Sequence, residues 1–162
     1  YGNNGSAFGR LWHGWNVRVL AYDKYLESYG SEKVIPVELS SLLEQADIIS
    51  LHIPLTPETL GMVNHEFISK CKKRFVLINT SRGKVVDLDA LLDGLRSEHL
   101  RGACLDVLPT EPPSSGTDDY QMKMEELYRM DNVVLSPHVA GWSVESKMRI
   151  AEIILQKLQS RK

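Results

Sequence analysis

Apolar residues in this chain fall into short uninterrupted runs, and these runs alternate with segments of helical periodicity. The runs predict buried strands at 17–22, 47–53, 74–79, 102–107 and 132–135. Apolar spacing and capping residues predict helices at 6–12, 39–46, 87–95 and 143–158, with a short helix starting at 56–58. Buried strands that alternate with helices indicate an α/β fold: a doubly wound parallel sheet with helices on both faces.

Composition and charge narrow the function classes. The 162 residues, 43% hydrophobic and 25% charged, suit one globular domain, and segment 109–119 is predicted to be a surface loop. A net charge of −2 argues against nucleic acid or an anionic membrane as the main partner. The longest apolar runs have four residues, too few for a membrane-spanning helix. Cys71 and Cys104 fit neither a disulfide framework nor a zinc site, so we expect reduced, buried thiols in a cytoplasmic protein without a metal.

The start of the chain carries part of a nucleotide-binding pattern. Tyr1 opens the chain without an initiator methionine, so we expect a piece of a longer protein. Gly2-Asn3-Asn4-Gly5 before a helix fits the end of a Gly-x-Gly-x-x-Gly turn, where glycine lets the backbone approach a pyrophosphate. Asp23 ends the next strand, where a carboxylate can hold ribose hydroxyls and repel a 2′-phosphate, which favours NAD over NADP. The alternative is that Asp23 is a solvated acid at a strand end.

Three further strand ends carry polar residues with catalytic potential. Arg82, Asp106 with Glu111, and His138 each follow a predicted strand, so a parallel sheet would place them at one edge. Individually they could be a surface ion pair, a solvated loop acid and a histidine bonded to backbone. Together they suit carbonyl reduction, because an arginine can hold a carboxylate while a histidine exchanges a proton. A carboxylate beside the imidazole would fix its tautomer and favour its protonated form.

Six motifs, in the same order, resemble the D-isomer-specific 2-hydroxyacid dehydrogenases. They are Gly2-Asn3-Asn4-Gly5, Val19-Leu20-Ala21-Tyr22-Asp23, Leu51-His52-Ile53-Pro54-Leu55-Thr56-Pro57-Glu58-Thr59, Asn79-Thr80-Ser81-Arg82-Gly83, Leu105-Asp106-Val107 with Glu111-Pro112, and Ser136-Pro137-His138-Val139-Ala140-Gly141. The resemblance covers nearly the whole chain. The family includes D-lactate, phosphoglycerate, glycerate/hydroxypyruvate and formate dehydrogenases.

The resemblance implies a role for each matching position. Arg82 would bind the substrate carboxylate, and His138 would be the acid/base with Glu111 as its partner. The implied NAD contacts are Gly2, Asn3, Asn4, Gly5, Asp23, Pro54, Thr59, Thr80, Ser81, Arg82, Asp106, His138, Ala140 and Gly141. Among these contacts, the asparagines would meet the pyrophosphate, Asp23 the adenosine ribose, and Asp106 the nicotinamide carboxamide.

The same resemblance implies that parts of the enzyme are missing. Residues 1–142 would be an NAD-binding domain without its first strand, and 143–162 a helix leading back toward an absent substrate domain. The chain alone should therefore fold poorly and be a poor enzyme. The whole protein would be a homodimer acting on a small 2-hydroxy or 2-keto acid, of the phosphoglycerate or D-lactate type. The alternatives are an NAD(H)-sensing protein like the corepressors of this fold, or an inactive structural module.

Overall fold

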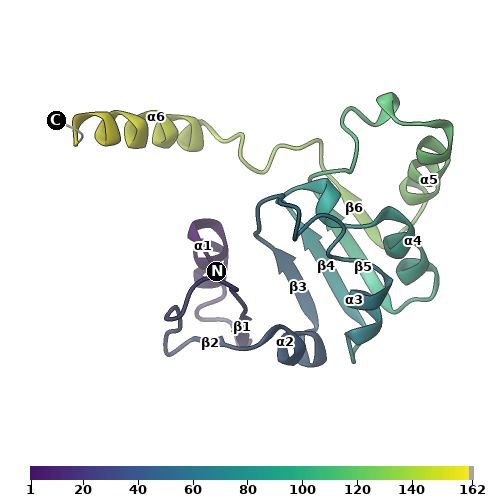
Figure 1. Ribbon diagram of the computed structural model, residues 1–162, viewed down its shortest axis with the longest axis horizontal. Coiled ribbons are helices and arrows are strands. Elements are labelled where there is room, and N and C mark those ends of the chain that lie inside the picture. The colour runs from purple at the N-terminus through teal and green to yellow at the C-terminus, as the bar shows by residue number, and fades with distance from the viewer. Residues whose placement is uncertain (161–162) are drawn as a thin grey trace.

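The computed structural model describes residues 1–160, which form an α/β protein with two parallel sheets (Figure 1). Residues 161–162, the last two of the predicted segment 143–162, lie outside the described residues. The helices and strands, in chain order, are α1 (Asn3–Leu11), β1 (Val19–Ala21), β2 (Val34–Pro36), α2 (Leu39–Gln45), β3 (Ile48–Leu51), α3 (His65–Lys70), β4 (Phe75–Asn79), α4 (Leu88–Arg96), β5 (Leu100–Leu105), α5 (Asp118–Tyr128), β6 (Val133–Leu135) and α6 (Val144–Gln159). Two short 3₁₀ helices, η1 (Gly83–Val85) and η2 (Pro113–Ser115), lie in loops.

The main sheet has the strand order β3-β4-β5-β6, and every neighbouring pair is parallel. Its strands end in one row, because Leu51 pairs with Asn79, Asn79 with Leu105, and Leu105 with Leu135. The loops that follow these strands therefore leave the sheet at one edge, which we call the carboxyl edge. The predicted parallel α/β class is confirmed.

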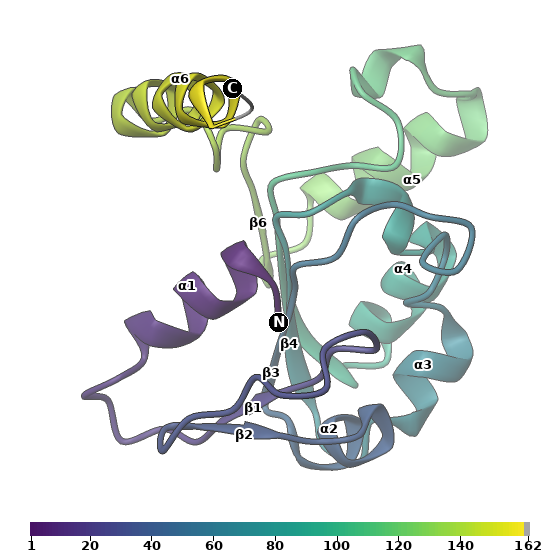
Figure 2. The same cartoon turned by 60° about the vertical axis from the view of Figure 1, so that its left-hand side comes forward.

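Helices α3, α4 and α5 cover one face of the main sheet (Figure 2). The core beneath them includes Phe75, Leu77 and Leu100, all fully buried. Asp87 caps α4, as predicted, by accepting the N–H of Ala90 at 2.9 Å. The leucine-rich face of α4 packs against the strands. Burial of that face supplies the main hydrophobic stabilisation of the domain.

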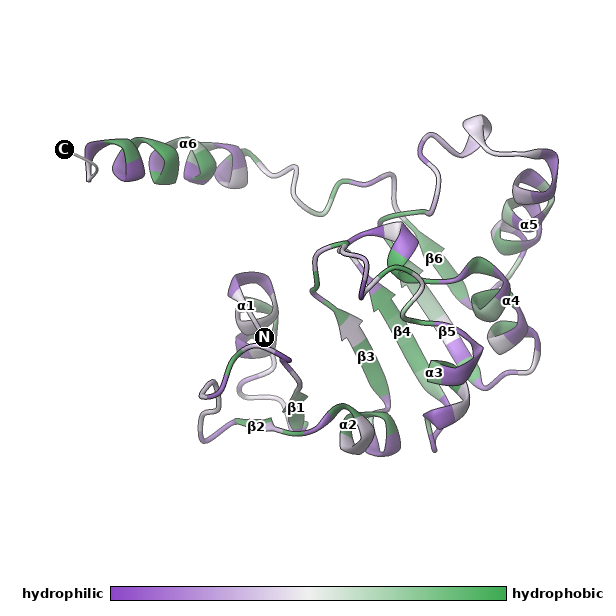
Figure 3. Cartoon of the chain, in the orientation of Figure 1, coloured by the Kyte–Doolittle hydropathy of each residue, from purple (hydrophilic) through white to green (hydrophobic). Residues whose placement is uncertain are grey.

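The opposite face of the sheet is only partly covered. Helices α1 and α6 lie on that side (Figure 2), yet the residues Ile48 and Val134 are 52% and 63% exposed. Helix α6 extends away from the sheets with no buried residue, although apolar and polar positions alternate along it (Figure 3). Its predicted N-cap Ser143 is confirmed, since its hydroxyl accepts the N–H of Ser146 at 3.0 Å.

A cavity of about 540 Å³ separates the two sheets. Strands β1 and β3 line it from opposite sides, together with apolar side chains of α1 and α2 such as Phe8 and Leu42. Within residues 1–160, β1 is paired only with β2, and β3 only with β4. Within the described residues, each of the two strands thus has a free edge along the cavity.

Several elements differ from the sequence predictions. Helix α1 begins at Asn3 rather than residue 6, and the helix expected at 56–58 is wrong, because a turn closed by Thr59 occupies that position. Strand β2 and helices α3 and α5 were not predicted. The first two are short, and α5 buries only Met124 and Leu127, so its apolar periodicity is weak. Helix α5 and η2 also interrupt the loop predicted at 109–119.

Among residues 1–160, no helix combines the length and the apolar character that crossing a membrane requires.

Candidate active site

The loop after β4 is organised by a buried asparagine. Asn79, which is fully buried, accepts the N–H of Ser81 at 3.0 Å and its hydroxyl at 2.8 Å. The Asn79 side-chain amide donates in turn to the carbonyl of Arg82 at 3.0 Å. These bonds leave Thr80 and the Arg82 side chain exposed at the carboxyl edge. One guanidinium N–H of Arg82 donates to the carbonyl of Ser81 at 2.6 Å. The other N–H groups of the guanidinium remain as donors for a ligand.

Asp106 connects the loops that follow β5 and β6. Its Oδ1 accepts the hydroxyl of Ser136 at 2.6 Å and the N–H of Val139 at 2.9 Å, while its Oδ2 accepts the N–H of Ala140 at 3.0 Å. Burial alone raises the pKa of Asp106, but these hydrogen bonds outweigh burial and hold the pKa below its usual value. A charged carboxylate therefore fixes the loop on both sides of His138.

His138 and Glu111 form a hydrogen-bonded pair at the same edge. The Nδ1 of His138 lies 2.6 Å from Oε2 of Glu111, and their side chains are 49% and 36% exposed. The other oxygen of Glu111 accepts the N–H of Leu108 at 2.9 Å, which anchors the carboxylate. Partial burial raises the pKa of Glu111, yet the bonds from Leu108 and His138 prevail and lower it.

The backbone of His138 has a positive φ of 56°, a conformation that L-residues adopt rarely. Backbone hydrogen bonds on both sides of His138 hold it in this conformation. His138 donates its N–H to the carbonyl of Ser136 at 2.9 Å, and the Asp106 carboxylate accepts the N–H groups of the next two residues. Strain of this kind is typical of functional sites. The imidazole is therefore held facing the Glu111 carboxylate by its whole loop.

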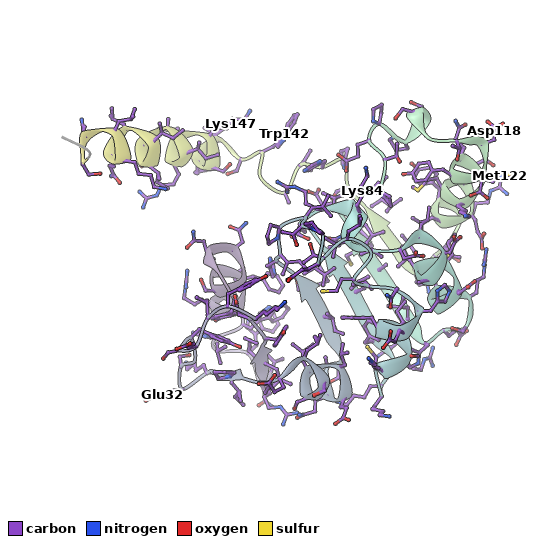
Figure 4. All side chains as sticks on the ribbon, in the orientation of Figure 1. Glu32, Lys84, Asp118, Met122, Trp142 and Lys147 are labelled. Atoms are coloured by element: carbon purple, nitrogen blue, oxygen red, sulfur yellow. The ribbon has the colours of Figure 1, made fainter. Side chains whose placement is uncertain are left out.

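The structure brings some of the predicted catalytic residues together directly and others only through the shared edge. His138 and Glu111 are in contact, and Asp106 holds the His138 loop. Within residues 1–160, no hydrogen bond or ion pair joins Arg82 to His138 or Glu111. Lys84 of η1 also projects at this edge, whereas Trp142 and Lys147 lie on the segment leading away from it (Figure 4).

The glycine turn begins helix α1, and Asp23 lies just beyond the carboxyl end of β1. Gly2 is the N-cap of the nine-residue helix α1, and no side chain caps the first N–H groups of that helix. A Cβ on Gly2 would find no atom within 4 Å, so the backbone there is open to close approach. Gly5 packs against His52, the residue after β3. Asn3 and Asn4, which precede Gly5, are exposed. An uncapped helix N-terminus with an open glycine suits a pyrophosphate group.

Asp23 lies two residues after the end of β1 and is only partly exposed. Its Oδ1 accepts the N–H groups of Tyr25 at 2.9 Å and Leu26 at 3.2 Å, and its Oδ2 lies against the backbone nitrogen of Tyr1. Asp23 therefore lies beside the glycine turn, in a loop that its own Oδ1 holds.

The remaining predicted cofactor positions lie in loops of the same edge. Pro54 and Thr59 belong to one tight turn, in which the Thr59 hydroxyl donates to the Pro54 carbonyl at 2.7 Å. The Ser81 hydroxyl donates its hydrogen bond to Asn79, and the N–H of Ala140 donates to Asp106. Gly141 is exposed, and a Cβ on it would meet no atom within 4 Å.

Sequence reasoning missed the organising residues of the site. Asn79 ends a buried strand, and a polar side chain at that position was a usable signal. Lys24 and Tyr25 follow Asp23 directly, but the sequence contains no sign that both of their side chains contact Glu58, more than thirty residues away. The contribution of the Leu108 N–H to Glu111 is likewise visible only in three dimensions.

Comparison with known proteins agrees with this geometry. Residues 1–140 match the family model of the D-isomer specific 2-hydroxyacid dehydrogenase, NAD binding domain. A glyoxylate reductase of Korarchaeum cryptofilum is 41% identical over 160 residues, which cover 97% of this chain and 46% of that protein. This chain thus spans less than half the length of that curated relative.

Two solved structures share the fold. The D-lactate dehydrogenase of Aquifex aeolicus, complexed with NAD and lactic acid, has a TM-score of 0.81 at 34% identity, covering 98% of this chain and 50% of that chain. A D-isomer specific 2-hydroxyacid dehydrogenase of Xanthobacter autotrophicus, in complex with NADPH and MES, has a TM-score of 0.73 at 32% identity, covering 86% and 42%. The fold therefore occurs with both dinucleotides.

Proposed function

The chain belongs to the family of D-isomer specific 2-hydroxyacid dehydrogenases, of which it carries the NAD-binding domain, and we propose that the protein interconverts a D-2-hydroxy acid and its 2-keto acid. NAD would bind at the carboxyl edge and would supply the hydride acceptor, and its reduced form would supply the hydride. The observation that carries the proposal is the 2.6 Å contact between His138 and Glu111 at the edge where Arg82 also projects. The substrate would be a small 2-hydroxy or 2-keto acid, in a cytoplasmic homodimer.

His138 would move the proton at the substrate oxygen. Glu111 engages Nδ1 of the imidazole, so Nε2 is the nitrogen left to give a proton to a carbonyl oxygen or take one from a hydroxyl. The negative charge of Glu111, anchored by the Leu108 N–H, would lie beside the positive charge that the imidazole carries whenever it holds the transferred proton. In the other direction the same pair accepts the proton of the hydroxy acid.

Arg82 would orient the substrate. Its guanidinium is exposed and uses one N–H on the Ser81 carbonyl, which leaves donors for a bidentate pair with the substrate carboxylate. Because Arg82 and His138 follow strands on either side of β5, a small acid could bind the guanidinium with its 2-oxygen toward the imidazole. That arrangement is an expectation for the complete protein, in which a substrate domain would close over the site.

The chemistry of the residues at the edge supports the binding of NAD there. The α1 N-terminus with Gly2, Asn3, Asn4 and Gly5 would hold the pyrophosphate, and Asp23 the adenosine ribose. Oδ2 of Asp106 accepts a single hydrogen bond, so it retains capacity for a carboxamide N–H. The other residues that would line the NAD site at this edge are Pro54, Thr59, Thr80, Ser81, Ala140 and Gly141.

Replacing the imidazole tests the proposed acid/base. In the full-length protein, we expect His138→Ala to lower kcat for NADH oxidation by ~10²–10⁴-fold, the usual contribution of general acid–base catalysis. The 2-keto acids to test are pyruvate, hydroxypyruvate, glyoxylate and phosphohydroxypyruvate. NADH binding, measured by calorimetry, should stay within about twofold, since the imidazole is not part of the proposed pyrophosphate or ribose contacts.

The matched control is His65→Ala, which removes another exposed histidine bonded to a carboxylate, Asp93, at 3.0 Å. This variant should keep full activity. Unchanged turnover in His138→Ala, or equal losses in the two variants, would remove His138 from the assigned role.

A further inference from the structure

Three side chains join the loops that follow β1 and β3. Oε2 of Glu58 accepts the Nζ of Lys24 at 2.9 Å and the hydroxyl of Tyr25 at 2.8 Å. Lys24 and Tyr25 are the two residues after Asp23, and Glu58 lies in the turn between Pro54 and Thr59. We call this group the Lys24–Tyr25–Glu58 bridge.

Both ends of the bridge are held by hydrogen bonds. On one side, Oδ1 of Asp23 accepts the N–H of Tyr25 at 2.9 Å, so the carboxylate and the bridge share one loop. On the other side, the Thr59 hydroxyl accepts the N–H of Thr56 at 2.8 Å and donates to the Pro54 carbonyl at 2.7 Å. Glu58 therefore projects from a firm turn toward the loop that carries Asp23.

The bridge is a charged pair at neutral pH. Hydrogen bonds from Lys24 and Tyr25 lower the pKa of Glu58, and the bond to Glu58 raises the pKa of Lys24. The lysine head group also lies 5.7 Å from the centre of the Tyr25 ring. The ammonium group of Lys24 therefore interacts with both the Glu58 carboxylate and the Tyr25 ring.

We propose that Glu58 is a specificity-determining residue, which keeps Lys24 from serving a 2′-phosphate and so reserves the site beside Asp23 for a dinucleotide with a free 2′-hydroxyl. The inference rests on the proposed function, because it assumes that Asp23 holds the adenosine ribose. A 2′-phosphate needs a cation nearby, and Lys24 is the cationic side chain adjacent to Asp23 in the chain. Glu58 supplies the competing anion, so removing its charge would release the lysine.

The test compares dinucleotide affinities, measured by calorimetry in the full-length protein. In Glu58→Gln, which keeps a hydrogen-bond acceptor but loses the charge, we expect the Kd of NADPH to fall about two- to fivefold, the scale of an exposed ion pair. The Kd of NADH should change less than the Kd of NADPH. The gain should shrink at high salt, where exposed charges are screened.

Two further variants show whether the lysine is responsible. The double variant Lys24→Met/Glu58→Gln should lose the gain in NADPH affinity, because no released cation remains. Glu66→Gln is the matched control, since it removes a glutamate charge from another exposed ion pair, with Lys70 at 2.6 Å on α3. A gain that equals that of Glu66→Gln, or that persists without Lys24, would overturn the inference.

Asp23→Ala separates this inference from the proposed function. If Asp23→Ala shifts the preference toward NADPH while Glu58→Gln does not, the ribose assignment stands and the role of Glu58 falls. If neither variant shifts the preference, the ribose assignment is wrong and the inference falls with it. A shift in both variants, with the gain of Glu58→Gln dependent on Lys24, supports both.

Discussion

Asn79 and Asp106 are almost completely buried polar side chains, and each organises a loop at the carboxyl edge. A buried polar group is costly unless its hydrogen bonds are made. Asn79 makes its bonds within the loop that follows it, and Asp106 makes its bonds to the loop after β6. Arg82 and His138, the exposed residues proposed to bind the substrate carboxylate and to move the proton, are therefore positioned by buried residues that do neither. At the scale of single residues, the site depends on its supports as much as on its reactive groups.

Replacing Asp106 should destabilise the fold in a pH-dependent way. Asp106→Asn removes the charge that accepts three hydrogen bonds, and we expect the free energy of unfolding at pH 7 to fall by about 2 kcal/mol. The folded-state pKa of Asp106 is lowered, so the carboxylate stabilises the fold above the usual carboxyl range near pH 4. That stabilisation is lost as pH falls through the lowered pKa.

Urea unfolding of both proteins from pH 7 to pH 3 measures this difference. The gap between wild type and Asp106→Asn should narrow toward pH 3, because the wild-type carboxyl then begins to take up its proton. The exposed turn residue Asp131 provides the control, and Asp131→Asn should change stability by less than about 0.5 kcal/mol at pH 7. A gap that is constant with pH would contradict the role of the Asp106 charge.

At the scale of elements, the carboxyl edge depends on how closely neighbouring loops pack. Gly83 begins η1 after β4, and a Cβ built on it would lie 2.0 Å from the carbonyl carbon and oxygen of Leu108, in the loop after β5. Leu108 in turn donates its N–H to Glu111. The Arg82 loop and the Glu111 loop are thus in direct contact, and glycine is what permits it.

Gly83→Ala should therefore separate the two loops. We expect a loss of stability of about 1–3 kcal/mol, or more, because the clash is with backbone that cannot rotate away. The matched substitution Gly141→Ala, where a Cβ meets nothing within 4 Å, should leave the free energy of unfolding almost unchanged. Chemical denaturation of both variants measures this, and equal effects would show that the close approach at Gly83 is not needed.

At the scale of the whole molecule, the chain forms a well-packed half and an open half. Strands β4 and β5, with helices α3 to α5, enclose a fully buried core, whereas β1 and β2 stand across a cavity of about 540 Å³. Both β1 and β3 have a free edge along this cavity, and free edges readily pair with another extended strand. The cavity is lined on both sides, so a strand that fills it should be apolar on both faces.

An apolar strand supplied separately should therefore stabilise the chain. We expect a soluble peptide with a short valine and isoleucine core to raise the Tm and to protect β1 and β3 amides from hydrogen exchange. At a concentration 100 times its Kd, such a peptide would contribute about 2.7 kcal/mol. The same peptide with a central proline is the control, because proline cannot complete the ladder. Equal effects of the two peptides would contradict strand pairing in the cavity.

The amino-acid sequence alone determined the alternation of apolar strands and helices, the N-caps Asp87 and Ser143, and the strand ends that carry Asp23, Arg82 and His138. These features are local: hydrophobic periodicity and capping act over a few residues, so they can be read along the chain.

Only the tertiary structure decided which loops touch. The hydrogen bonds of Asp106 to residues 136–140 and the Lys24–Tyr25–Glu58 bridge each join residues about thirty or more positions apart. The resemblance implied that Glu111 is the partner of His138, and the structure adds the 2.6 Å contact between Nδ1 and Oε2. Their geometry depends on strand register and on the close approach at Gly83, which no local pattern encodes. Element types follow from short-range preferences, whereas the arrangement of the site follows from how the strands align.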